Sequence, residues 1–187
     1  FVDPKEKEKI EKIPTKFDFP IKDHITLGKE LDLIDLEAGV KTSGFRGYYL
    51  KNEAVLMQFG LLWHALKKMQ EKGFALMAPP VLAKEFAFYG SGHFPFGKAD
   101  QYQILTEEDA EKGIKEPLYL AGTSEPSLLA YYSDKTFKEK DLPIKVCGVS
   151  SCFRGEVGSY GKDTKGIYRI HEFYKVEQVV LFIADII

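Results

Sequence analysis

The stretch from Val146 to Ile183 constrains the fold of this chain more than any other. Its first part, Val146–Val157, is rich in β-branched residues, and its last part, Ile167–Ile183, alternates between apolar and polar side chains. The connection, residues 158–166, holds three glycines among charged and polar residues, a composition typical of an exposed loop. We therefore predict two strands joined by a polar loop.

The polar face of this hairpin has an unusual composition. Because successive side chains of a strand point to opposite faces, Arg169, Phe173 and Glu177 share one face of the second strand. Arg154 and Glu156 share a face of the first strand in the same way. A face in contact with water is the ordinary explanation of such alternation, but an aromatic ring among the charges does not serve that purpose. Guanidiniums can grip phosphates and a ring can stack on a base, so the pattern favours a nucleotide site without a Walker loop or dinucleotide fingerprint.

The segment FRGEVGSYGKDTKGIYRIHEFYKVE, residues 153–177, resembles the second signature motif of class II aminoacyl-tRNA synthetases, in the form found in seryl-tRNA synthetases. Every fixed position of that motif is present. The resemblance implies an α+β fold, a class II synthetase-like antiparallel sheet flanked by helices. It also implies that residues 1–187 are the N-terminal portion of a catalytic domain, without the third motif and without the helical arm that binds tRNA. The first residue is Phe, which suggests that a longer polypeptide has been cut.

The resemblance assigns roles to five residues of the hairpin. Arg154 is the expected catalytic residue, which binds the α-phosphate of ATP and the carboxylate of serine. Gly155 and Glu156 belong to the ATP-binding segment, in which Glu156 accepts from the adenine amino group. Phe173 stacks on adenine, and Arg169 holds the outer phosphate of a bent ATP with the help of Mg²⁺. A flat strand would carry Arg169 about 26 Å from the far end of the motif, so we expect it in the loop, turned back toward the phosphates.

A second polar group, Thr123-Ser124-Glu125, begins a predicted helix with Pro126 in its first turn. The ordinary interpretation is structural, because Thr caps helices and Glu favours the positive end of the helix dipole. The resemblance favours a different role, since seryl-tRNA synthetases bind serine through Thr-x-Glu at this place. Ser124 stands where the family usually has Ala, and Glu177 would complete the serine pocket.

A long helix is predicted over Asn52–Lys72, with Asn52 as its cap and Gly73 as its left-handed stop. Its inward stripe consists of Val55, Phe59, Leu62, Leu66 and Met69. A short strand, Phe74–Leu82, follows. Together these segments resemble the first class II motif, which implies a homodimer formed through Asn52–Pro80; a plain amphipathic helix and core strand is the alternative.

Composition excludes several classes of protein. With 187 residues, of which 44% are hydrophobic, the chain can form one sizeable core. A net charge of −2 argues against binding nucleic acid through bulk positive charge. No apolar run approaches the ~20 residues of a membrane span and no signal peptide is visible, so we expect no membrane partner. Cys147 and Cys152 lie at a spacing that suits neither zinc nor a disulfide, which favours reduced thiols and the cytoplasm.

The function implied by the resemblance is that of a serine–tRNA ligase, which joins serine to tRNA(Ser) at the expense of ATP. This piece alone is expected to be inactive. One alternative is a related ligase that charges a carrier protein, although such relatives use a metal-bound pocket and no convincing Cys/Glu ligand set is present. We expect no metal-binding residues. The other alternative is a catalytically silent paralogue that serves as an interaction module.

Overall fold

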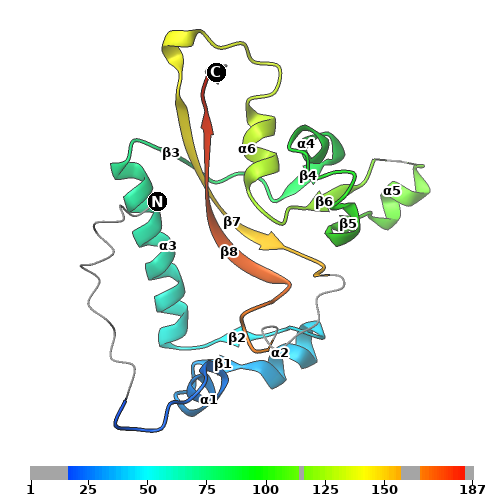
Figure 1. The fold of residues 1–187 in the computed structure, drawn as a ribbon. Coiled ribbons are helices and arrows are strands. Elements are labelled where there is room, and N and C mark those ends of the chain that lie inside the picture. The colour runs from blue at the N-terminus through cyan, green and yellow to red at the C-terminus, as the bar shows by residue number, and fades with distance from the viewer. Residues whose placement is uncertain (1–16, 114–115, 157–164, 184–187) are drawn as a thin grey trace.

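The computed structural model describes residues 17–113, 116–156 and 165–183. Its central feature is an antiparallel hairpin of β7 (Ile144–Phe153) and β8 (Glu172–Leu181), which crosses the middle of the molecule (Figure 1). β3 (Ala75–Met77) pairs with the other edge of β7, and it runs parallel to that strand. The predicted hairpin and the predicted antiparallel architecture are therefore confirmed, with one parallel pair that the prediction did not contain.

Both hairpin strands are shorter than predicted on the loop side. The ladder continues for one step beyond the strands, because the backbone N–H of Arg154 donates to the carbonyl of His171 at 3.0 Å. At Glu156 the chain leaves the sheet with a φ of 53°, a conformation that a strand cannot contain. We had expected Arg154 and Glu156 to share a face of the first strand. That prediction was wrong, because neither residue belongs to β7, which ends at Phe153. The predicted loop lies mostly outside the described residues, which resume at Lys165.

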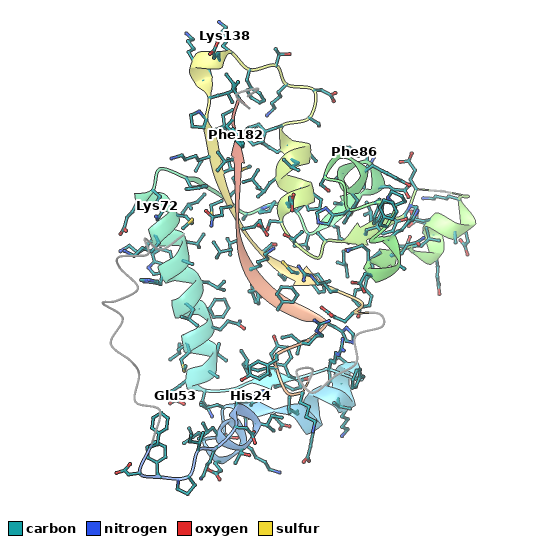
Figure 2. All side chains as sticks on the ribbon, viewed as in Figure 1. His24, Glu53, Lys72, Phe86, Lys138 and Phe182 are labelled. Carbon is teal, nitrogen blue, oxygen red and sulfur yellow. The ribbon has the colours of Figure 1, made fainter. Side chains whose placement is uncertain are left out.

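The long helix α3 (Glu53–Glu71) runs between the labelled Glu53 and Lys72 in Figure 2 and confirms the predicted helix. The prediction that Asn52 caps it through its side chain was wrong. The side-chain amide of Asn52 donates instead to the carbonyl of Asp32 at 2.9 Å, and no side-chain cap bond is present. Gly73, with a φ of 80°, ends the helix as predicted. The strand predicted over Phe74–Leu82 is limited to β3.

The predicted stripe of α3 faces the sheet. Its members are half-buried except Phe59, whose ring lies 6.0 Å from that of Tyr174 on β8. Two other apolar residues point outward, because Leu56 and Trp63 are 72% and 66% exposed and do not line the groove between α3 and β8. The stripe therefore packs within this chain, and any surface that α3 offers to a second copy consists of these outward residues.

A second sheet lies beside the hairpin and carries the most deeply buried aromatic residues. Its order is β4-β6-β5, and all its pairs are antiparallel. The strands are β4 (Leu82–Lys84), β5 (Tyr102–Ile104) and β6 (Leu118–Leu120). Phe88, from α4 (Glu85–Gly90), stacks on Phe94 at 4.8 Å, and both rings contact Tyr119 of β6. This cluster forms a core of its own, which supports the chain entering α6.

The remaining elements are short. They are α1 (His24–Glu30), β1 (Ile34–Asp35), α2 (Leu36–Ser43), β2 (Tyr49–Leu50), α5 (Glu107–Glu111), α6 (Glu125–Tyr131) and the 3-10 turns η2 (Lys98–Asp100) and η3 (Glu139–Asp141). Among the described residues, no helix has the length and apolar character needed to cross a membrane. Cys147 and Cys152 are buried free thiols of β7, and burial raises the pKa of each.

Candidate active site

The start of α6 lies against the hairpin because the facing position of β7 is a glycine. Gly148 pairs with Glu177 of β8. A Cβ atom at Gly148 would meet Cβ of Ser124 at 2.9 Å and Cδ1 of Leu128 at 3.0 Å, too close for real side chains. The missing side chain therefore lets α6 approach the sheet, and it brings Thr123 within reach of Glu177.

Thr123 contacts the hairpin and does not cap its own helix. The N-cap of α6 is Ser124, which makes no side-chain cap bond, so the capping interpretation was wrong. The Thr123 side chain is buried, and its hydroxyl donates to Oε2 of Glu177 at 2.6 Å. Lys175 completes a triangle, because its ammonium donates to the Thr123 hydroxyl at 3.0 Å and pairs with the Glu177 carboxylate. Two predicted pocket residues are thus in direct contact, although 54 positions separate them.

The environment of Glu177 keeps its carboxylate ionised. Burial raises the pKa of Glu177. The hydrogen bonds from Lys175 and Thr123, together with the charges of Lys175 and Arg154, lower this pKa by more than burial raises it. The net result is a pKa below the ordinary value. The side chain is 19% exposed, so the carboxylate remains accessible at the edge of the cluster.

The other two residues of the predicted serine group, Ser124 and Glu125, differ in how deeply they are buried. The hydroxyl of Ser124 lies 2.8 Å from the hydroxyl of Ser150 on β7, and the side chain is fully buried. Ser124 therefore joins α6 to the sheet. Glu125 is the first residue of α6 and is half-buried, which leaves its carboxylate near the surface.

Arg154 connects the pocket to the nucleotide half of the predicted site. Its Nε donates to the carbonyl of Gly122 at 3.1 Å, directly before Thr123 in the chain. Its guanidinium carbon lies 5.2 Å from the centroid of the Phe173 ring, within cation–π range. Nδ1 of His171 lies 2.9 Å from the carbonyl oxygen of Arg154, so side-chain and backbone bonds both hold this residue. A cation, an aromatic ring and a carboxylate pocket therefore follow one another along the hairpin.

Glu156 and Arg169 pair with each other. Nη1 of Arg169 lies 2.9 Å from Oε2 of Glu156, and the glutamate side chain is the more buried partner. Arg169 precedes β8 and lies off the strand, as the length of the motif required. Gly155 donates its backbone N–H to the carbonyl of Asp100 at 2.8 Å, which anchors this turn to η2, just before β5 of the second sheet.

Sequence reasoning missed Lys175 as a site residue. The signal was present, because Lys175 occupies the position between Phe173 and Glu177 on the same strand face. Its contact with Thr123 depends on the approach of α6 and so was not visible in the sequence. Within the described ranges, no group of three or more His, Cys, Asp or Glu residues is arranged to hold a metal ion.

Comparison with known proteins gives a consistent result. Residues 105–186 match the family model described as tRNA synthetase class II core domain (G, H, P, S and T). The chain is 46% identical over 167 residues to the serine–tRNA ligase of Corynebacterium diphtheriae, a match that covers 89% of this chain and 38% of that protein. The serine–tRNA ligase of Treponema denticola is 43% identical over 165 residues, covering 88% of this chain and 37% of that protein.

Two solved structures resemble the fold. Seryl-tRNA synthetase from Pyrococcus horikoshii, complexed with ATP, superposes with a TM-score of 0.76 at 39% identity, covering 88% of this chain and 35% of that one. The cytoplasmic serine–tRNA ligase from Naegleria fowleri, in complex with AMP, gives 0.75 at 35% identity, covering 84% and 35%. The chain thus spans less than two fifths of the length of these relatives.

Proposed function

Because the chain is homologous to the class II core domain of serine–tRNA ligases, we propose that it forms the N-terminal part of the catalytic domain of such an enzyme. The full enzyme activates serine with ATP and transfers it to tRNA(Ser). The observation that carries this proposal is the 2.6 Å hydrogen bond between Thr123 and Glu177. It joins the segment that leads into α6 to the nucleotide-type hairpin, next to Arg154.

The nucleotide half of the site consists of residues around the turn of the hairpin. Phe173 offers the adenine ring a stacking surface, and Arg154 holds the α-phosphate. Glu156 accepts from the adenine amino group, with Gly155 in the same turn, and Arg169 holds the outer phosphate. The ion pair between Glu156 and Arg169 is compatible with these roles, because a bent ATP brings its outer phosphate back toward the base. Complexes of the two solved relatives with ATP and AMP support nucleotide binding here.

The serine half is the pocket between α6 and β8. Thr123 and Glu177 contact the substrate, and Glu125 supplies a second carboxylate near its ammonium group. Ser124 supports the pocket from behind through Ser150. A site rich in acceptors suits a ligand that brings several donors, as serine does with its ammonium and hydroxyl groups.

The reaction needs no covalent nucleophile from the protein. A carboxylate oxygen of serine attacks the α-phosphorus of ATP, the bond to the β-phosphate oxygen breaks, and pyrophosphate leaves. The terminal ribose hydroxyl of tRNA then attacks the seryl carbonyl, and AMP leaves. The protein aligns the reactants and stabilises charge on the α-phosphate, for which Arg154 is suited because its guanidinium is already held by Gly122.

Mg²⁺ is best assigned to the substrate. Mg²⁺ is commonly bound by nucleotide phosphates with few protein carboxylates. We therefore expect it to arrive with ATP. No step of the reaction above depends on a protein-bound ion.

Assembly and location follow from the same proposal. The region Asn52–Pro80 would form a homodimer interface, through the outward residues Leu56 and Trp63 of α3, because large apolar side chains on one exposed helix face are costly to leave in water. The cytoplasm is the expected location, since the similar enzyme from Naegleria fowleri is a cytoplasmic serine–tRNA ligase.

ATP–pyrophosphate exchange with the full-length protein tests this function. We expect exchange that depends on serine, and then formation of seryl-tRNA with tRNA(Ser). Serine-dependent exchange without tRNA charging, but with charging of a carrier protein, would favour the alternative ligase. Absence of exchange with every amino acid would favour the silent paralogue.

A further inference from the structure

Lys175 has a position that the proposed reaction does not explain. Its ammonium contacts both Thr123 and Glu177, the two residues proposed to hold serine. The lysine side chain is 33% exposed, so this is a partly desolvated pair and not an ordinary surface ion pair. A protein cation in a pocket for a cationic substrate should weaken binding unless it has a task of its own.

The hydrogen bonds of Thr123 suggest that task. A threonine hydroxyl has one proton to donate and two lone pairs that accept. The proton is directed at Glu177, at 2.6 Å, and one lone pair accepts from Lys175, at 3.0 Å. Only one acceptor position is left, and it cannot become a donor while both neighbours stay in place. Lys175 and Glu177 thus determine that the Thr123 hydroxyl can only accept a hydrogen bond from a ligand.

The charges lead to the same result. Lys175 already balances the carboxylate of Glu177. Within the part of the chain that the structure describes, Glu125 forms no ion pair, so its carboxylate remains for an incoming ammonium. With Glu125 in the proposed serine pocket, the pocket has two carboxylates of different kinds: Glu177 is neutralised by Lys175, and Glu125 would be neutralised by the substrate.

We propose that Lys175 is a positioning residue of the serine pocket: it fixes the Thr123 hydroxyl and the Glu177 carboxylate as acceptors for the donors of serine. This inference rests on the proposed function. Lys175 need not touch serine, because it acts through Thr123 and Glu177. It differs in this from Arg154, which is proposed to touch the reacting phosphate.

Loss of the Lys175 ammonium should change the pH dependence of the reaction with serine. The titratable and charged groups that interact electrostatically with Glu177 are the ammonium of Lys175, the guanidinium of Arg154 and the thiols of Cys147 and Cys152, of which Cys147 lies on the opposite face of the hairpin. Burial, which raises the pKa of Glu177, remains when Lys175 is replaced by a neutral side chain, whereas the donor and charge of Lys175 are lost. The pKa of Glu177 should then rise, and the acid limb of kcat/KM for serine should move to higher pH.

The test compares Lys175→Met with Lys175→Arg in the full-length protein, by ATP–pyrophosphate exchange over serine and ATP titrations. We expect Lys175→Met to raise KM for serine roughly 10- to 100-fold, with KM for ATP nearly unchanged, and Lys175→Arg to restore part of the loss. Lys145→Met is the matched control, since Lys145 is an exposed residue near the start of β7, with its ammonium 5.9 Å from the Phe74 ring. It should leave all constants unchanged.

A double-mutant cycle with Glu177→Gln separates positioning from a general loss of structure. If Lys175 acts through Glu177, Lys175→Met should have a much smaller effect in the Glu177→Gln background. Additive effects, or an acid limb that does not move, would overturn the inference even if both variants are active. A wild-type protein without serine-dependent exchange would overturn the proposed function and this inference together.

Discussion

Replacement of Glu177 by alanine tests the serine pocket most sharply. In the structure the carboxylate accepts from Thr123 at 2.6 Å and pairs with Lys175, with 19% of its side chain exposed. Alanine removes the acceptor and leaves the lysine cation in a partly buried position. The variant should therefore bind serine poorly while the nucleotide residues at the hairpin turn remain in place.

The size of the effect follows from the burial of the group. A hydrogen bond to a charged partner contributes about 1.5–3 kcal/mol, and the low exposure of Glu177 favours the upper part of this range. A loss of about 2–3 kcal/mol corresponds to a roughly 30- to 150-fold decrease in kcat/KM for serine. KM for ATP should change little, because no proposed nucleotide contact involves Glu177.

The assay is ATP–pyrophosphate exchange with the full-length protein over a serine titration at saturating ATP, and the converse titration. Glu172→Gln is the matched control, since Glu172 lies on the same strand at an exposed position of the opposite face. A Glu177→Ala variant with weakened ATP binding and unchanged use of serine would refute the location of the pocket.

Three further predictions concern the hairpin. Arg154→Ala should lower the exchange rate at least ~100-fold at any serine concentration, because the charge that it stabilises grows in the transition state; a rate rescued by excess serine would contradict this. Gly148→Val should destabilise the chain by about 1–3 kcal/mol in urea unfolding, since any added side chain collides with Ser124 and Leu128, and an unchanged midpoint would show that α6 does not pack as described. The pKa of Glu177 is lower in the folded state than its ordinary 4.5, so its contribution to stability is present above that pH and is lost as the pH falls below it; Glu177→Gln should flatten the fall of the melting temperature in this acidic range, and an identical slope would argue against the ion pair.

Local patterns in the sequence predicted the hairpin and α3 well. Alternation in the second strand and the apolar period over Asn52–Lys72 are properties of neighbouring residues, and the structure contains both elements. The ends of the strands were less predictable, because β7 ends at Phe153 and the chain turns away through Gly155, whose N–H bonds to the distant Asp100, and Glu156, whose φ is 53°. The capping role predicted for the Asn52 side chain failed because of a contact with a distant residue. Its amide donates to the carbonyl of Asp32, 20 positions earlier in the chain.

The site itself depends on contacts between distant segments. Capping and substrate binding were both reasonable interpretations of Thr123, and only the hydrogen bond to Glu177 favours the second. That bond requires Gly148 on another strand, whose role is invisible without the packing of α6. The parallel pairing of β3 with β7 is equally non-local. Motif resemblance predicted Thr123 and Glu177 as pocket residues, but it did not reveal that Lys175 contacts both of them.

We propose that serine and ATP react along one continuous site from Thr123 and Glu177 to Arg154 and Phe173. A crystal structure of the full-length protein with a non-hydrolysable seryl-adenylate analogue tests it most directly. We expect the seryl group between α6 and β8, the phosphate mimic on Arg154 and the adenine on Phe173. An analogue bound away from the β7–β8 hairpin, or with its seryl group out of contact with both Thr123 and Glu177, would contradict the account.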